Sequence, residues 1–441
     1  MSTVTERNTL NIADATCTYC GSLCDDIALS TAGDAITKAT NACSLGEQWF
    51  FSQHSEQGPA CLIDGRPGSL DEGIARAARI LHEARYPIVF GLCETTSAAQ
   101  RAAVSLADWA GACVDATAGN HGATALALQE VGEVTCTLGE VKERGDLIIF
   151  WGCNPVESHP RHLSRYSLEP AGEFVPGGRR DRFCVVVDDR ETATALVADQ
   201  FIAIKPGKDF EALWILRALA KDVELDAGLV EAETGVSLST WRELMSRMKH
   251  ARYGVIFSGS SQQTPFDAHQ CSHAIFALVR DMNAYARFVC VSMGGPGNAA
   301  GAENVMTWQT GYPFAVNLSR GYPRFGPRDF AVADVLERAE CDAALIVAED
   351  LLSRLTPAAR EHLHRIPTIV LHARDTATAA IATVALRTAT YGINTPGTVY
   401  RADGVPISLR PALPSPLPSD EEMLKRIEGG LREMQAAGAG A

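Results

Sequence analysis

The chain has 441 residues, of which 46% are hydrophobic, 21% charged and 7% aromatic. This composition is that of a globular protein, and at about 100–200 residues per domain the length predicts two to four domains. The formal net charge of −14 argues against nucleic-acid and anionic-lipid partners, because an acidic surface repels them. No apolar run reaches the roughly 18 residues of a membrane helix. The first residues lack the apolar stretch of a signal peptide, so we expect a soluble, cytoplasmic protein.

Short apolar runs alternate with helical patterns along most of the chain. Because these runs lack polar alternation, they are typical of strands that helices cover on both faces. We expect strands at Ile88–Leu92, Leu147–Gly152, Phe183–Asp188, Gly254–Gly259, Phe288–Ser292, Ala344–Ala348 and Thr368–His372. We expect helices at Asp71–Ala84, Ser97–Ala110, Asp209–Lys221, Asp267–Met282 and Asp329–Ala339, with Ser69 or Asp71, Asp209 and Asp267 as N-caps. The alternation predicts an α/β protein with more than one parallel, Rossmann-like sheet.

The predicted elements divide the chain into four parts. Residues 1–58 do not follow the strand–helix rhythm and are predicted to form a small cysteine-motif domain. An α/β domain over residues 59–125 and 328–410 is expected to hold an inserted α/β domain over residues 126–327. Residues 411–441 form a Pro-rich tail, which we expect either to fray or to serve as an arm for a partner.

Four of the 13 cysteines lie close together in the sequence, in Cys17-Thr-Tyr-Cys20-Gly-Ser-Leu-Cys24 and at Cys43. The short gaps let three thiolates of one loop reach three corners of a [4Fe–4S] cluster, which a distant fourth cysteine completes. Four thiolates also suit a structural zinc ion, although zinc sites more often pair two C-x-x-C units. The third interpretation is four thiols that bind no metal. The other cysteines stand singly and are interpreted as buried hydrophobic residues.

A second segment with chemical content, Trp151-Gly-Cys-Asn-Pro-Val-Glu-Ser-His159-Pro-Arg161-His162-Leu-Ser-Arg165, directly follows a predicted strand. Open α/β sheets bind ligands at the carboxyl ends of their strands, and the four basic side chains here would suit a phosphate or carboxylate. The two histidines lack the spacing of a helical zinc pair. The alternative is a helix start whose basic side chains are solvated or paired with acids, and the residues alone slightly favour it.

Two further segments carry weaker signals. Gly294-Gly-Pro-Gly-Asn298-Ala-Ala-Gly301 follows another predicted strand but matches neither G-x-G-x-x-G nor a Walker loop. It indicates either close approach of the backbone to a ligand or only a turn. The aromatic segment Thr307–Phe314, which includes Tyr312, suits either a binding surface or packing under a loop.

Taken together, these strings resemble those of a known family. From Cys17 to about Ile407 the chain resembles the B subunit of the tungsten- or molybdenum-dependent formylmethanofuran dehydrogenases, a branch of the molybdopterin oxidoreductases. The likeness is carried by CTYCGSLCDDI, NACSLG, HGATALALQEVGE, FWGCNPVESHPRHLSRY, VVVDDRETATALVAD, TWQTGYPFAV and GTVYRADGVPI. The resemblance implies a molybdopterin-oxidoreductase fold, in which a small iron–sulfur domain precedes interleaved α/β domains. It also implies that the cysteines at 17, 20, 24 and 43 bind an electron-relay [4Fe–4S] cluster.

Two departures from that family bear on activity. The resemblance implies a metal-binding cysteine at the position of Asn120, directly before His121, in redox-active members. An amide oxygen binds tungsten or molybdenum far more weakly than a thiolate does. The resemblance also implies an Arg in place of Gly294 and Gly-His in place of Gly295-Pro296, lining the catalytic pocket. The chain is therefore expected to have a vestigial metal site, no molybdopterin with tungsten or molybdenum, and no catalytic residue.

The chain is also similar to the B subunit of the formyltransferase/hydrolase complexes of methylotrophic bacteria, which perform no electron transfer. This similarity implies a structural subunit in one-carbon oxidation, where formyl groups pass from tetrahydromethanopterin to a methanofuran-type carrier and leave as formate. The implied partners are amidohydrolase-like, formyltransferase and C-type subunits. The carrier itself is expected to contact His159, Arg161, His162 and Arg165.

Two alternatives stay open. The first is a working tungsten or molybdenum formylmethanofuran dehydrogenase subunit, in which Asn120 or another group accepts the metal. The second is a pterin- or cluster-binding protein with an unrelated activity. Metal analysis separates the first alternative from a structural subunit, because only a working dehydrogenase needs tungsten or molybdenum.

Overall fold

The computed structural model describes residues 9–53, 58–116, 121–259 and 265–439, and the chain divides into two compact units. Residues 1–118 and 295–441 form the first unit, and residues 119–294 form the second. The predicted insertion over 126–327 is therefore too long at its C-terminal end. The boundary lies at 294 because helix α11 (Ala299–Thr310) packs against α3 (Ser97–Ala110), and strand β13 (Val316–Asn317) pairs with β7 (Cys113–Ala116).

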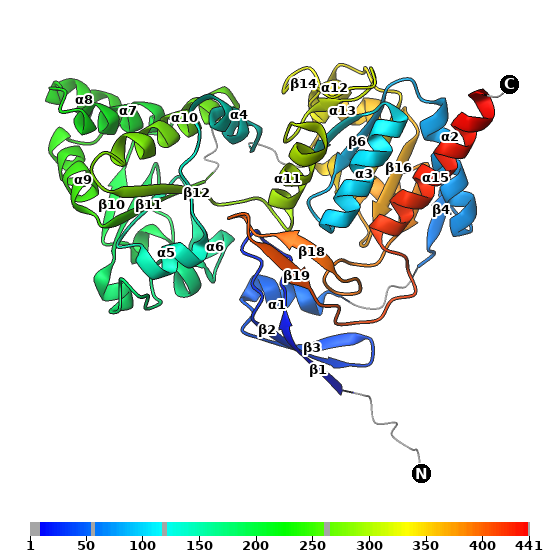
Figure 1. The fold of residues 1–441 in the computed structure, drawn as a ribbon, viewed down its shortest axis with the longest axis horizontal. Helices are drawn as coiled ribbons and strands as arrows, with labels where there is room; N and C mark the ends of the chain where they lie inside the picture. The colour runs from blue at the N-terminus through cyan, green and yellow to red at the C-terminus, as the bar shows by residue number, and fades with distance from the viewer. Residues whose placement is uncertain (1–8, 54–57, 117–120, 260–264, 440–441) are drawn as a thin grey trace, which may run out of the picture. The chain divides into compact units, whose positions relative to one another are not determined.

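The first unit is built on a nine-stranded sheet of order β14-β13-β7-β6-β15-β16-β17-β4-β5 (Figure 1). Strands β7, β6, β15, β16 and β17 are parallel, and the outer strands pair antiparallel. The remaining bounds are β4 (Cys61–Ile63), β5 (Arg66–Pro67), β6 (Pro87–Gly91), β14 (Arg324–Phe325), β15 (Ala343–Val347), β16 (Thr368–His372) and β17 (Val384–Arg387). The parallel strands are almost continuously apolar because helices cover both faces of the sheet.

Different helices cover the two faces of this sheet. One face packs against α3, α11, α2 (Leu70–Glu83) and α15 (Asp420–Ala439). The other packs against α12 (Val332–Glu337), α13 (Pro357–Leu363), α14 (Ala377–Ala380) and the short helix η4 (Leu351–Arg354). Because helices cover both faces of the sheet, a ligand is expected to bind at the loops that follow the carboxyl ends of the strands.

The C-terminal segment packs on the first unit, where the sequence predicted either a frayed tail or an arm for a partner. Helix α15 packs against α2 and α3, and it buries Met423, Leu424, Ile427 and Leu431 completely. These apolar residues recur with helical spacing, which gives α15 one apolar face. The Pro-rich stretch before the helix is also packed, because Ala412 and Leu413 lie in the core of the N-terminal part of the chain.

The second unit contains a five-stranded, wholly parallel sheet of order β10-β9-β8-β11-β12. Its strands are β8 (Leu147–Trp151), β9 (Phe183–Asp188), β10 (Gln200–Ala203), β11 (Tyr253–Ser258) and β12 (Arg287–Ser292). One face is covered by α4 (His121–Val131), α7 (Asp209–Ala220), α8 (Ala227–Thr234), α9 (Leu238–His250) and α10 (Pro265–Met282). The other face carries α5 (Leu138–Arg144), α6 (Pro155–Ser158), η1 (Leu163–Ser167) and η3 (Ala195–Val197), and η2 (Gly178–Asp181) precedes β9.

The N-terminal part has its own antiparallel sheet, formed by β1 (Thr9–Ala15), β2 (Ile27–Ala32) and β3 (Ala35–Thr40). Helix α1 (Ser44–Phe51) closes a small core around it. A hairpin of β18 (Gly397–Tyr400) and β19 (Pro406–Leu409) follows much later in the chain. The predicted small domain over 1–58 thus has its own sheet, but it belongs to the first compact unit.

Several predicted elements agree with the structure at both ends, namely the strands Phe183–Asp188 and Thr368–His372 and the helix Ser97–Ala110. Ser69 is confirmed as an N-cap, since it forms a capping box with Glu72. Asp209 is instead the first residue of its helix and follows the N-cap Lys208. The side chain of Asp267 lies outside the description. Within the described ranges, no helix combines the length and apolar character needed to cross a membrane.

Candidate functional site

The cysteine motif forms a closed loop between β1 and β2. The backbone N–H of Cys17 donates to the carbonyl oxygen of Cys24 at 2.8 Å, and the N–H of Leu23 donates to that of Cys20 at 3.1 Å. Leu23 has a φ of 38°, a left-handed conformation that turns the chain back sharply. The loop therefore gathers three cysteines that are separated by only two and three residues in the sequence.

The fourth cysteine reaches the loop from the start of α1. Cys43 is the N-cap of this helix, and its Sγ accepts a hydrogen bond from Gly46 N at 3.4 Å. A Cβ on Gly46 would lie 3.3 Å from Cys17 Sγ and 3.7 Å from Cys43 Sγ, so glycine leaves room for two sulfur atoms at one place. The structure thus brings Cys43 next to the loop, as the sequence predicted.

The electrostatics of the Cys17 and Cys20 thiols favour a bound positive centre. Burial raises the pKa of the Cys20 thiol to about 11 and that of Cys17 above its ordinary range, and the neighbouring cysteines raise both further. The backbone N–H groups of Tyr19 and Ser22 act in the opposite direction. Thiolates buried side by side need a compensating cation, which a metal centre supplies. The donor set therefore fits the [4Fe–4S] cluster that the sequence suggested.

The arrangement of the side chains supports a single zinc ion no more than it supports an iron–sulfur cluster. Among the residues that the structure describes, no three His, Cys, Asp or Glu side chains are arranged so that they could hold a metal ion. The four cysteines of the motif, all of them described, form no disulfide bond.

The turn at Pro296 and Gly297 packs on the cysteine loop. Cys20 and Pro296 form an isolated antiparallel bridge. A Cβ on Gly297, where φ is 53°, would lie 2.7 Å from Cys93 O and 3.4 Å from Thr18 O, so glycine is required by conformation and by space. Gly297 therefore serves close packing of one backbone on another.

The predicted vestigial metal site is only partly described. Asn120 lies outside the described residues, and His121 is described only as the first residue of α4. Gly294 follows β12 and is half-buried. The relation of Asn120 to Gly294 therefore stays a prediction from the sequence.

The segment after β8 places its histidines inside the second unit. The ring of His162 packs edge-on against Phe257, with ring centroids 4.5 Å apart, and lies 6.0 Å from Phe150. Burial lowers the pKa of His162 to about 3 and that of His159 to about 4, so both are neutral near pH 7. His162 is 2% exposed, which is typical of a core residue.

Arg161 and Arg165 of the same segment are half-buried. Both make interactions with other residues of the chain. The predicted contact of this segment with a carrier stays a prediction, and the burial of the two histidines favours a packing role for them.

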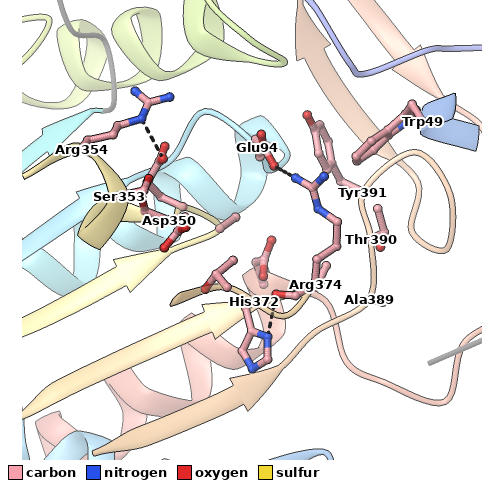
Figure 2. Close-up of a pocket in the computed structure, with 15 residues that line it drawn as sticks. Trp49, Glu94, Asp350, Ser353, Arg354, His372, Arg374, Ala389, Thr390 and Tyr391 are labelled. Carbon is pink, nitrogen blue, oxygen red and sulfur yellow. Dashed lines mark hydrogen bonds and ion pairs between the residues drawn. The ribbon is translucent and has the colours of Figure 1, made fainter. Parts of the chain in front are cut away.

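A pocket that sequence analysis missed lies at the carboxyl ends of β15 and β16, where α/β sheets commonly bind ligands. Its volume is about 220 Å³. Figure 2 shows Arg374 pointing to Glu94, with which it forms an ion pair, while Arg354 pairs with Glu349 at 3.4 Å. The Arg374 guanidinium also lies 4.8 Å from the ring centroid of Trp49 in α1. In the sequence, the acidic and basic residues that directly follow β15 and β16 could have indicated this pocket.

Comparisons with known proteins agree with this architecture. Over 434 residues the chain is 37% identical to the B subunit of the tungsten-containing formylmethanofuran dehydrogenase 2 of Methanocaldococcus jannaschii, with 96% of this chain and 99% of that protein covered. The protein of the same name from Methanococcus maripaludis is 37% identical over 431 residues, 95% of this chain and 98% of its own length. The B subunit of the formyltransferase/hydrolase complex Fhc of Methylorubrum extorquens is 26% identical over 290 residues, 66% of this chain and 74% of that protein. No family model matches the chain.

Two solved structures share the fold. One is the formyltransferase/hydrolase complex FhcABCD from Methylorubrum extorquens in complex with methylofuran, with a TM-score of 0.71 and 25% identity over 86% of this chain and 100% of the matched chain. The other is acetylene hydratase from Pelobacter acetylenicus, with a TM-score of 0.66 over 95% of this chain and 69% of the matched chain, where 12% identity indicates likeness of fold alone. The chain therefore has a molybdopterin-oxidoreductase-related fold. It belongs to the family of formylmethanofuran dehydrogenase B subunits.

Proposed function

We propose that this chain is the structural, redox-inactive B subunit of a formyltransferase/hydrolase complex. The observation that carries the proposal is Asn120, which stands directly before His121 where redox-active members have a metal-binding cysteine. An amide oxygen is a far weaker ligand for tungsten or molybdenum than a thiolate. Gly294 supplies no cation at the place of the family's Arg. The donor set therefore does not fit a molybdopterin with tungsten or molybdenum.

In this proposal the chemistry takes place on partner subunits. A formyltransferase subunit moves formyl groups from tetrahydromethanopterin to a methanofuran-type carrier, and an amidohydrolase-like subunit releases them as formate. Together with a C-type subunit, these partners assemble on the present chain. The similarity to the B subunit of Fhc, and to a chain of the complex solved with methylofuran, supports this assignment.

The four clustered cysteines are proposed to hold a [4Fe–4S] cluster with a structural role. When bound, the cluster supplies a cross-link between the loop of Cys17, Cys20 and Cys24 and the start of α1 at Cys43. The three short strands and one helix of this part enclose only a small core, and such small units commonly depend on a metal for stability. Loss of the cluster should therefore impair assembly before it affects any chemistry on the partners.

A second candidate function is that of a redox-active dehydrogenase subunit. It is favoured by the 37% identity over 96% of the chain to tungsten-containing relatives. The complete set of four gathered cysteines also suits an electron relay. This candidate requires Asn120 or another group to accept the metal.

Metal and activity analysis of the complex purified with its untagged partners tests the proposal. We expect about four iron atoms per chain, no tungsten or molybdenum, and formyl hydrolysis without an electron acceptor. Tungsten or molybdenum near one atom per chain, with pterin released on denaturation, would establish the second candidate instead. As an internal check, Asn120→Cys alone should not produce dye-linked formate oxidation, because Gly294 still lacks the cation.

A further inference from the structure

Tyr391, which is far from the cysteine loop in the sequence, is hydrogen-bonded to one peptide unit of that loop. The hydroxyl of Tyr391 donates to the carbonyl oxygen of Thr18 at 3.1 Å, and both residues are buried. The N–H of Tyr19, which belongs to the same peptide unit as that carbonyl, acts on the thiol of Cys17 and lowers its pKa against the effect of burial. In a trans peptide the carbonyl oxygen and the amide hydrogen point in opposite directions. Because the hydroxyl of Tyr391 fixes the carbonyl of Thr18, it also directs the N–H of Tyr19, on the opposite side of the peptide, toward the sulfur atom.

The same arrangement occurs a second time in the loop. The backbone N–H of Ala402, in the turn between β18 and β19, donates to the carbonyl oxygen of Gly21 at 3.0 Å. The N–H of Ser22, in the same peptide unit as that carbonyl, acts on the thiol of Cys20 and lowers its pKa, as the Ser22 side chain also does. No peptide bond among the described residues is cis, so the geometric argument holds for both units.

The turn after β12 restricts the tyrosine from the other side. A Cβ on Gly297 would lie 2.5 Å from the hydroxyl oxygen of Tyr391, which shows how closely this turn packs on that hydroxyl. Because Tyr391 is only 4% exposed, solvent water does not compete for the hydrogen bond of its hydroxyl. The hydroxyl is thus confined to the direction of Thr18.

We infer that Tyr391 and the N–H of Ala402 are positioning groups for the iron–sulfur cluster, since they aim two N–H donors at the sulfur atoms of Cys17 and Cys20. This inference rests on the proposal that the four cysteines hold a [4Fe–4S] cluster. Hydrogen bonds to the sulfur ligands are among the factors that set the reduction potential of such clusters. They stabilise the reduced state most, because it carries more negative charge on sulfur. Removal of either donor should therefore lower the reduction potential.

The variant Tyr391→Phe tests the inference because it deletes the hydroxyl and keeps the ring. We expect the anaerobically prepared complex to retain its iron and to titrate at a more negative potential, with a changed electron paramagnetic resonance spectrum of the reduced cluster. The matched control is Tyr86→Phe, which deletes a half-buried hydroxyl bonded to Asn317 Nδ2 at 3.0 Å in the same unit. This control should leave the potential unchanged. An unchanged potential in Tyr391→Phe, with iron retained, would overturn the inference.

A second variant decides the matter if Tyr391→Phe is recovered without iron. Ala402→Pro removes the N–H that holds Gly21, and it lies at the second position of a turn closed by Gly404 N and Arg401 O at 2.8 Å, where proline is favoured. It should shift the potential in the same direction as Tyr391→Phe. If the wild type contains iron and Ala402→Pro does not shift the reduction potential, the inference is overturned while the proposed cluster stands. A wild-type complex without iron overturns the proposed cluster, and the inference with it.

Discussion

Cys20 and Pro296 lie opposite each other in an antiparallel bridge, although one belongs to the N-terminal cysteine loop and the other to the turn after β12. Pro296 follows Gly294, the position where the resemblance to the family implies an Arg. The cysteine loop and the backbone at Pro296 are therefore packed on each other. A change in one of them is expected to reach the other.

The first prediction concerns Asn298, which is fully buried and ties this turn to the rest of the first unit. Its Nδ2 donates to the carbonyl oxygen of Thr95 at 2.9 Å, and its Oδ1 accepts from the N–H of Tyr400 at 2.7 Å. Asn298→Ala leaves both backbone groups without these partners, at a cost of about 1–3 kcal/mol each in the free energy of unfolding. Urea unfolding of the purified protein measures the loss.

The exposed Asn11 provides the control for that measurement. Its side chain accepts a hydrogen bond from Ser30 Oγ at the surface, so Asn11→Ala should change the free energy of unfolding by less than about 0.5 kcal/mol. Equal effects of the two substitutions would contradict the role assigned to Asn298.

The second prediction concerns the cysteines. Cys20→Ser should remove the brown colour and the iron of anaerobically purified complex, because the cluster loses a thiolate in the centre of its binding loop. Iron analysis and the visible spectrum report this loss. Cys136→Ser changes another half-buried cysteine outside the motif and should leave the iron content unchanged. A fully assembled, active wild-type complex with neither iron nor zinc would show that the four thiols are a relic.

The third prediction concerns the pH dependence of stability. Burial lowers the pKa of His162 from 6.5 to about 3, so the unfolded chain binds a proton at this residue that the folded chain does not. The contribution of neutral His162 to the free energy of unfolding is therefore complete above about pH 6.5. It is lost as the pH falls toward 3, by about 1.4 kcal/mol per pH unit. His162→Leu should flatten this part of the pH profile of thermal unfolding.

The fourth prediction concerns the last helix. Ile427 of α15 is fully buried in the core of the first unit. The substitution Ile427→Ala should therefore lower the free energy of unfolding by about 2–4 kcal/mol. Chemical denaturation measures the change. Lys425→Ala, on the exposed side of the same helix, should have an effect near zero. If Ile427→Ala had no larger effect, the C-terminal helix would not be docked as described.

Local sequence patterns determined the fold class and several elements. The strands Phe183–Asp188 and Thr368–His372 and the helix Ser97–Ala110 were predicted with the bounds that the structure gives. Such elements could be predicted because apolar periodicity acts over a few neighbouring residues. The spacing of Cys17, Cys20 and Cys24 likewise lies within one loop, so its chemistry was visible without the fold.

Tertiary structure decided what depends on contacts between distant segments. The end of the second unit at 294 follows from the two-residue strand β13, which is too short to give a sequence signal and exists only by pairing with β7 and β14. His162 is a core residue because Phe150 and Phe257, on two different strands, surround it. The sequence by itself determined that this chain has a parallel α/β fold and four clustered cysteines. Only the folded chain places the hydroxyl of Tyr391 on Thr18, since a hydrogen bond across 373 residues has no local pattern.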